Sequence, residues 1–318
     1  MAKLSFLDKL EMMARGQARL AALSRTIPEL SGLVIGDSLQ AKPGRVVISA
    51  RLNGAPVIAK FVDGPGGADE VKRMEAALAR RLPRMQSGPF RVPRPVHFAP
   101  DEGLAVIERV PGRRLQDLLA EADESARRVL LSRAAGWLGA YAAGSEKEVT
   151  FGVRFWAKNR AEAAATGRDA ATRAVTGAIA DRLAEQVPVL SDRIIRQALI
   201  HGDFTPLNML MDETAVWGVD LSLVTHWPVV RDVATMLVFT STAHPVPRPL
   251  WGVDPVALDA LLSTGLLDEH PPGLLRFWTG VKLSMDLLSL SNSARRRGAA
   301  LDMAEHWLAD RSDFREGP

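Results

Sequence analysis

The feature that most constrains this chain is a short polar segment, residues 201–220, in a second half whose apolar residues otherwise repeat with helical spacing. Residues 208–211 and 215–220 each favour a short strand, and Asp212-Glu213-Thr214 favours a turn between them. An antiparallel hairpin brings its two ends together, with strands about 5 Å apart. We therefore expect Asn208 and Asp220 to be neighbours at its open end.

These side chains have the chemistry of a metal and phosphate site. An amide oxygen and a carboxylate suit Mg²⁺, which takes one or two protein ligands and completes its shell with phosphate oxygens and water. Asp203 precedes Asn208 on a loop with Pro206 and can face the same cleft without binding the metal. A carboxylate beside a metal-bound triphosphate is what phosphoryl transfer requires. The same residue types also favour turns and strand ends, but the aspartate at the returning end of the hairpin favours the catalytic interpretation.

The first third of the chain predicts a small part rich in β-strands. Two β-rich runs joined by Asn53-Gly54 predict a hairpin with a type I′ turn, because both turn residues tolerate positive φ. Lys60 lies in the second of these strands, among apolar neighbours. Residues 37–45 are polar with a Pro-Gly break and predict a loop. Helices are expected at 5–24 and 68–82, and further strands at 91–98 and 104–110.

Pro111-Gly112 marks a boundary, and the remainder is mostly helical apart from the polar segment. The absence of cysteine excludes disulfides, a cysteine nucleophile and thiolate metal sites. The formal net charge of +3 is too small to indicate a nucleic-acid or membrane-surface partner. The start lacks the apolar run of a secretory signal, and no stretch approaches the roughly 18–20 apolar residues that span a bilayer. We expect a soluble cytoplasmic protein of undetermined oligomeric state.

The sequences HGDFTPLN and VDLS closely resemble the catalytic and metal-binding segments of the aminoglycoside phosphotransferase and choline kinase group, small-molecule kinases with a protein-kinase-like fold. The resemblance implies that Asp203 is the catalytic base and that Asn208 and Asp220 hold magnesium. Arg231-Asp232 and the following Val-Ala resemble the buried aspartate that follows the metal loop in this group. Asp232 is therefore expected to accept hydrogen bonds from backbone N–H groups of the catalytic loop, which His201 helps to shape.

The resemblance extends into the first third. Lys60 resembles the lysine that holds the phosphates of ATP, and Glu75 on the predicted helix is the best match for its ion-pair partner, with Glu70 as the competing choice. Residues 108–115 resemble the linker between the lobes, where backbone groups of Glu108 to Val110 would meet adenine. No G-x-G-x-x-G motif precedes Lys60, so the loop that covers the triphosphate is expected around residues 37–45. Ser222 stands where many relatives carry glycine or a second acid, which leaves one or two metal ions open.

Together these features imply a bilobal α+β fold, with a β-rich nucleotide-binding lobe at residues 1–110 and a larger, mainly helical lobe at 111–318 that carries the catalytic loop and the substrate site. The implied activity is ATP- and Mg²⁺-dependent phosphorylation of a hydroxyl group on a small molecule that is aminoglycoside-, amino alcohol- or sugar-like. Residues 206–318 have more acidic than basic side chains, which would suit a cationic acceptor. The alternatives are a non-catalytic nucleotide-binding protein of this fold and a metal-dependent hydrolase, in which Lys60 would have no role.

Overall fold

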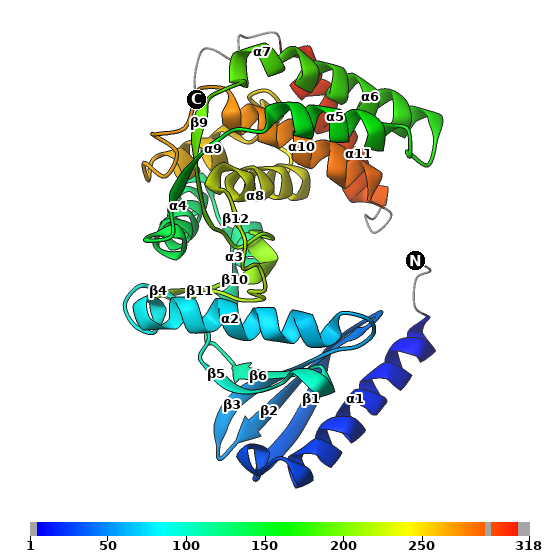
Figure 1. Ribbon diagram of the computed structural model, residues 1–318, viewed down its shortest axis with the longest axis vertical. Helices are drawn as coiled ribbons and strands as arrows, with labels where there is room; N and C mark the ends of the chain where they lie inside the picture. Colours follow the sequence, from blue (N-terminus) through cyan, green and yellow to red (C-terminus); the bar gives the residue numbers. More distant parts are fainter. Residues whose placement is uncertain (1–4, 290–293, 311–318) are drawn as a thin grey trace. The chain divides into compact units, whose positions relative to one another are not determined.

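The computed structural model describes residues 5–289 and 294–310 (Figure 1). The chain forms two compact units. The first unit comprises Met1–Gly112 together with Leu210–Val224, and the second comprises Arg113–Met209 together with Thr225–Pro318. The expected division into residues 1–110 and 111–318 stays a prediction, and the units differ from it in grouping the segment Leu210–Val224 with the N-terminal part.

A five-stranded antiparallel sheet forms the centre of the first unit, in the strand order β1-β2-β3-β6-β5. Its strands are β1 (Leu33–Lys42), β2 (Arg45–Leu52), β3 (Ala55–Val62), β5 (Pro95–Ala99) and β6 (Leu104–Glu108). The hairpin predicted at Asn53-Gly54 is confirmed, because β2 and β3 pair directly across it. Its turn residues have φ values of 51° and 83°, as a type I′ turn requires.

The edge strand β1 corrects one prediction. Residues 37–45 are polar enough to predict a loop, but most of them continue β1, and only Pro43-Gly44 forms the turn into β2. An edge strand pairs on one side only, and most side chains of β1 are exposed or partly exposed. Polar residues are therefore compatible with a strand at this position.

Two helices cover opposite faces of this sheet (Figure 1). They are α1 (Phe6–Thr26) and α2 (Gly67–Met85). Ala59 of β3 shares a core cluster with Leu20 of α1, whereas Val62 of β3 shares one with Met74 of α2. Because side chains alternate along a strand, Lys60 lies on the same face as Val62 and so faces α2.

A second, smaller sheet of the first unit contains the predicted hairpin. Three of its four strands are β4 (Phe90–Arg91), β10 (Met209–Met211) and β11 (Val216–Gly218). β11 pairs in parallel with β4 and has β10 on its other side. An Asp212 carboxylate oxygen accepts hydrogen bonds from the N–H groups of Thr214 and Ala215, at 2.8 and 2.9 Å, which closes the predicted turn.

The second unit is mainly helical. Its helices are α3 (Leu115–Glu121), α4 (Glu124–Ala142), α5 (Val153–Ala164), α6 (Ala170–Glu185), α7 (Val187–Leu190), α8 (Val229–Ala243), α9 (Pro255–Leu262), α10 (Leu274–Leu288) and α11 (Ala294–Ala309). Its strands are β7 (Arg113–Arg114), β8 (Lys147–Thr150), β9 (Ile194–Leu199) and β12 (His226–Pro228). The described residues of the two units also form three short 3₁₀ helices, Pro28–Leu30, Pro100–Glu102 and Pro206–Asn208.

Helices α8 and α10 form the core of the second unit. They are buried on nearly all sides and contact each other, as helices that are apolar all round do. Strands β8, β9 and β12 form a three-stranded antiparallel sheet, with β9 in the middle. The sheet-rich N-terminal part and the helical C-terminal part confirm the predicted α+β fold class.

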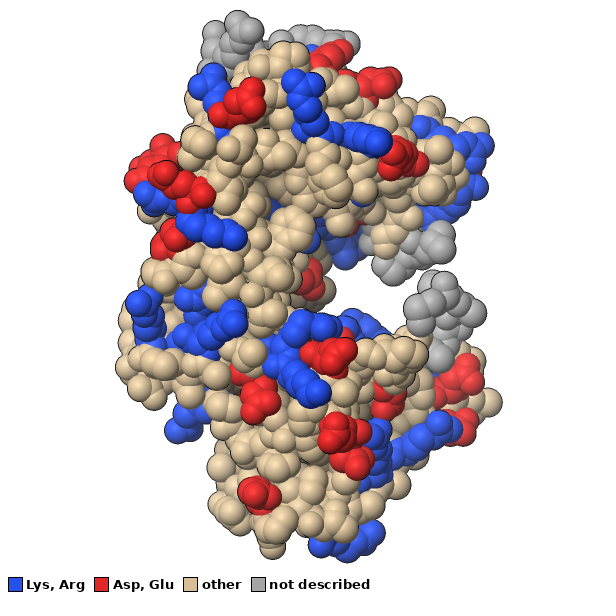
Figure 2. All heavy atoms as spheres, viewed as in Figure 1, with Lys and Arg blue, Asp and Glu red and all other residues tan. Residues whose placement is uncertain are grey.

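The surface charge is mixed. Figure 2 shows acidic and basic side chains interspersed over the visible face, with basic side chains gathered over α2. Of the basic residues on α2, Lys72, Arg73, Arg80 and Arg84 are exposed. None of the helices in the described parts of the chain has the length and apolar character that crossing a membrane would require.

Candidate active site

The loop that follows β9 is fixed by a buried carboxylate. Asp232, in the first turn of α8, is fully buried, and its Oδ2 accepts a hydrogen bond from the N–H of His201 at 2.7 Å. The N–H of Gly202 donates to both carboxylate oxygens, at 3.1 and 3.2 Å. The φ of Gly202 is 86°, a conformation that glycine adopts without strain. These are the backbone contacts predicted for Asp232.

Burial has the largest effect on the acidity of Asp232. It raises the pKa of this carboxyl to about 6, against the opposing influence of His201, Arg231 and the two backbone donors. The ring of His201 is itself buried, with its centroid 5.8 Å from that of Trp137 and 6.3 Å from that of Phe204. Its Nδ1 accepts a long hydrogen bond, 3.4 Å, from the N–H of Asp203. His201 and Asp232 thus both bear on the shape of this loop.

Asp203 and Asn208 are joined across the loop. The Nδ2 of Asn208 donates to the backbone oxygen and to Oδ2 of Asp203, both at 2.9 Å. Both acceptors are oxygens, so the amide must present its NH₂ group to them. The Oδ1 of Asn208 is then turned away from Asp203 and remains available as an oxygen ligand.

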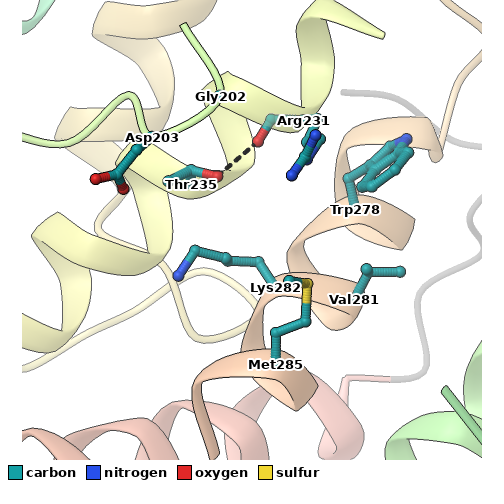
Figure 3. Close-up of a pocket in the computed structure, with 8 residues that line it drawn as sticks. All are labelled: Gly202, Asp203, Arg231, Thr235, Trp278, Val281, Lys282 and Met285. Atoms are coloured by element: carbon teal, nitrogen blue, oxygen red, sulfur yellow. Dashed lines mark hydrogen bonds between the residues drawn. The ribbon is translucent and has the colours of Figure 1, made fainter. Parts of the chain in front are cut away.

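A pocket of about 260 Å³ lies in the second unit beside Asp203 (Figure 3). Its walls come from the loop that follows β9, from α8 and from α10. The residues that line it are Gly202, Asp203, Arg231, Thr235, Trp278, Val281, Lys282 and Met285. In Figure 3, Asp203 lies at one edge of this group and Trp278 at the opposite edge.

Six of these eight residues, those on α8 and α10, were not predicted from the sequence to line a site. On α8, Arg231 and Thr235 are four residues apart, and Thr235 Oγ1 donates to the backbone oxygen of Arg231 at 2.9 Å. On α10, positions 278, 281, 282 and 285 follow the spacing of one helical face. That spacing was the available signal, but only the contact between α8 and α10 reveals that the two faces line one pocket.

In the first unit, Lys60 lies between two carboxylates. Its Nζ forms an ion pair with Oδ1 of Asp220, and Glu70 Oε1 lies 3.8 Å from the same Nζ. The side chain of Lys60 is only 11% exposed. Glu70 also pairs with Arg45, at 2.7 Å. Lys60, Glu70 and Asp220 form what we call the lysine cluster.

The choice of Glu75 as the ion-pair partner of Lys60 is wrong. α2 begins at Gly67, so Glu70 lies in its first turn and reaches Lys60. Glu75 is exposed, and no ion pair joins it to Lys60 within the described residues. The helix start, which sequence patterns locate least well, decides which glutamate faces the strand.

Asp220 follows β11 with φ of 64°, in the left-handed region. Aspartate is one of the few non-glycine residues that adopt this conformation readily. Its side chain is 41% exposed, so its carboxylate is accessible to a ligand.

The predicted adenine-binding linker continues from β6. The N–H of Glu108 donates to the backbone oxygen of Arg94 at 2.9 Å, and the N–H of Arg109 donates to that of Pro56 at 3.1 Å. The Glu108 carboxylate also binds the Arg94 side chain and raises the pKa of Arg94. No hydrogen bond among the described residues engages the N–H of Val110. That donor is therefore available to a ligand.

Comparison with known proteins identifies a family. Residues 47–259 match the family described as "Phosphotransferase enzyme family" (APH). No protein of curated function matches the chain significantly.

Solved structures share the fold. Aminoglycoside phosphotransferase APH(4)-Ia matches with a TM-score of 0.62 and 15% sequence identity, over 90% of this chain and 98% of that chain. A thermostable mutant of APH(4)-Ia, in a ternary complex with AMP-PNP and hygromycin B, gives 0.60 and 17% over 90% and 98%. The GDP and kanamycin complex of APH(2")-IIia gives 0.62 and 15% over 90% and 96%. These findings confirm the predicted resemblance.

Proposed function

The chain belongs to the phosphotransferase enzyme family, and from this premise we propose that it transfers the γ-phosphoryl group of ATP to a hydroxyl group of a small molecule, with Mg²⁺ as cofactor. The observation that carries the proposal is the lysine cluster. Lys60 and Asp220 are 160 residues apart in sequence, yet they form an ion pair in the first unit. A nearly buried lysine beside an accessible aspartate is the pair that a metal-bound triphosphate needs.

The linker supports a nucleotide with a purine base. The N–H groups of Glu108 and Arg109 are used within the protein, whereas that of Val110 is available. The side chain of Val110 packs with Ala215 and Trp217, so apolar surface lies next to this donor. A free donor beside apolar side chains suits the edge and the face of an aromatic base.

The residues present fit Mg²⁺. Asn208 Oδ1 and the Asp220 carboxylate are hard oxygen donors, and Mg²⁺ binds one or two such protein ligands together with phosphate oxygens and water. Within the parts of the chain described, His, Asp and Glu side chains form no cluster of three or more that could hold a metal. We propose that Asn208 and Asp220 hold the ion, which would neutralise charge on the phosphates when bound.

Nucleotide binding then requires a change of partner inside the lysine cluster. While Oδ1 of Asp220 pairs with Lys60, this oxygen is not free to bind the metal. Glu70, 3.8 Å from Lys60, is placed to hold the lysine when Asp220 leaves it. Lys60 would meanwhile donate to phosphate oxygens, as lysine does in other phosphate sites.

The catalytic loop would act on the acceptor. Asp203 orients the acceptor hydroxyl and takes its proton as the oxygen attacks the γ-phosphorus. The O–H bond breaks, the new O–P bond forms, and the bond from the γ-phosphorus to the bridging oxygen breaks to release ADP. The hydrogen bond from Asn208 Nδ2 to Oδ2 would fix the Asp203 carboxylate, and Asp232 would fix the backbone of the two preceding residues.

The test is release of ADP by the full chain with ATP and Mg²⁺ over a panel of small hydroxyl compounds, with mass spectrometry of the products and GTP in a parallel arm. We expect ADP formation that depends on one class of acceptor and a product heavier by one phosphoryl group. Nucleotide binding with no phosphorylated product would indicate the non-catalytic alternative. Ester hydrolysis without ATP would indicate the metal-dependent hydrolase.

A further inference from the structure

One cation in the pocket beside Asp203 forms no ion pair among the described residues. The Arg231 side chain is partly buried and lines the pocket. Within residues 5–289 and 294–310 it forms no ion pair and no side-chain hydrogen bond; only its backbone oxygen is engaged, by Thr235. Burial lowers the pKa of Arg231, opposed by its buried neighbour Asp232. An arginine stays protonated in proteins, so the pocket wall carries a positive charge.

Aromatic side chains hold Arg231 in place. Its guanidinium lies 4.4 Å from the ring centroid of Trp227. The ring centroids of Trp227 and Trp156 are 5.6 Å apart, and those of Trp156 and Trp278 are 4.8 Å apart. A chain of three indoles thus connects Arg231 to the tryptophan in the pocket wall. Stacking fixes the guanidinium but leaves its N–H donors for a ligand.

The nearby charges do not cancel this one. Lys282, the other cation of the lining, pairs with Asp286 on its own helix. Asp232, next to Arg231, turns its carboxylate to the backbone of His201 and Gly202. Asp203 lies at the opposite edge of the pocket from Trp278 in Figure 3. Arg231 is therefore the cation of this lining that forms no ion pair among the described residues.

The charge of Arg231 is opposite in sign to the acid excess of residues 206–318, from which a cationic acceptor is expected. Acidic residues scattered over the surface add to the net charge of the segment, but they do not set the charge inside the pocket. The apolar part of the lining comes from Trp278, Val281 and Met285. A volume of about 260 Å³ is slightly below the range of roughly 300–1,000 Å³ for ligand pockets, and it fits a compound of about one ring.

We propose that this pocket binds the acceptor, and that the acceptor is a small anionic alcohol whose carboxylate or phosphate group is bound by Arg231, with its apolar body against Trp278 and its hydroxyl group at Asp203. The role as an acceptor site rests on the proposed phosphotransferase function. The preference for an anion rests on the unpaired arginine alone. The two are therefore tested separately.

The first experiment measures binding by calorimetry without nucleotide. One series of probes keeps the ring and the hydroxyl constant while the charge changes: 4-(hydroxymethyl)benzoate, 4-(hydroxymethyl)benzamide and 4-(aminomethyl)benzyl alcohol. A second series is gluconate, glucose and glucosamine. 4-(Hydroxymethyl)phenyl phosphate distinguishes a phosphate site from a carboxylate site. We expect the anionic member of at least one series to bind about 10- to 100-fold more tightly than its neutral and cationic partners, as one charged hydrogen-bonded contact provides.

Variants assign the effect to Arg231. Arg231→Gln should remove the preference for the anion, and Arg231→Lys should retain part of it, because lysine keeps the charge but loses the forked geometry. The matched control is Arg193→Gln, an exposed arginine outside the pocket that forms no ion pair among the described residues. It should keep wild-type preference. Thermal unfolding of each variant establishes that it is folded.

Several outcomes would overturn the inference. They are tighter binding of neutral or cationic members in both series, no binding of any anionic probe up to about 10 mM, or an unchanged preference in a folded Arg231→Gln. The ADP-release assay separates the two claims. Anion binding that needs Arg231 without phosphorylation of any acceptor would overturn the acceptor role and the proposed function, whereas phosphorylation of amino sugars alone would overturn only the anion preference.

Discussion

Two partly buried cations, one in each unit, have different surroundings. In the first unit, Lys60 is balanced by Asp220 and Glu70. In the second unit, Arg231 lies against Trp227 and no carboxylate pairs with it among the described residues. Burial lowers the pKa of Arg231.

The contrast indicates what each region does with a ligand. A paired lysine must exchange a partner when a ligand arrives, which suits a metal-bound nucleotide that brings both a cation and phosphates. An unpaired arginine needs only an added anion. A partly buried cation without an ion-pair partner therefore indicates the charge of the ligand. The net charge of a whole segment does not.

The largest effect should come from the catalytic loop of the second unit. Asp203→Asn should lower turnover by about 10²–10⁴-fold, because the carboxylate that takes or orients the proton is lost. Nucleotide binding should hardly change. The comparison is steady-state ADP release against Asp181→Asn, an exposed aspartate on α6, which should retain wild-type turnover. Equal activity of the two variants would remove Asp203 from the mechanism.

A substitution at Asp232 tests whether its hydrogen bonds to the backbone of His201 and Gly202 stabilise that loop. Asp232→Ala should lower the free energy of unfolding by about 2–4 kcal/mol, because the buried N–H groups of His201 and Gly202 lose their acceptor. Activity should fall with it. Asp259→Ala, which removes an exposed ion pair with Arg128, should cost under about 1 kcal/mol. A fully stable but inactive Asp232→Ala would instead indicate a direct chemical role.

The second unit should also lose stability in acid through His270. Burial, reinforced by Arg196, lowers the pKa of His270 from 6.5 to about 4. Between these pH values the unfolded chain binds a proton that the folded chain does not, so stability falls as pH falls from about 6.5 to 4. Wild type should lose about 2 kcal/mol more than His270→Gln between pH 7 and pH 4.5. Denaturant unfolding at both pH values measures this, and parallel losses in the two proteins would contradict it.

A smaller effect should separate the two glutamates of α2. Glu70→Gln should raise the KM for ATP by about 3- to 10-fold, because Lys60 loses the partner that holds it when Asp220 leaves. Glu75→Gln, on the exposed side of the same helix, should change it by less than about twofold. The reverse order would mean that the helix reorients when nucleotide binds.

Local sequence patterns predicted much of the fold. Asn53-Gly54 can adopt positive φ at both positions, which was enough to predict the β2–β3 hairpin. Asp232 and its backbone partners also followed from the sequence. Where polarity was the only signal, the prediction failed: β1 is polar because it is an edge strand, not because it is a loop.

The remaining errors depend on tertiary packing. The starting residue of α2 decides between Glu70 and Glu75, and the sequence locates helix starts only approximately. Predicting the pocket wall requires knowing that α8 contacts α10, which lies about 50 residues further along the sequence. The local sequence does not distinguish Arg231 from a surface arginine. Its proposed role in binding depends on its contact with Trp227 and on the absence of an ion pair among the described residues.

The most direct test of the account compares the two aspartates by calorimetry of ATP binding at low and high Mg²⁺, with the variants Asp220→Ala and Asp203→Asn. Asp220→Ala should lose the dependence of ATP binding on Mg²⁺, because the proposed metal ligand is removed. Asp203→Asn should bind Mg²⁺-ATP almost as wild type does, although its turnover is strongly reduced. If Asp203→Asn loses metal-dependent binding while Asp220→Ala keeps it, the two roles are reversed and the proposed mechanism is wrong.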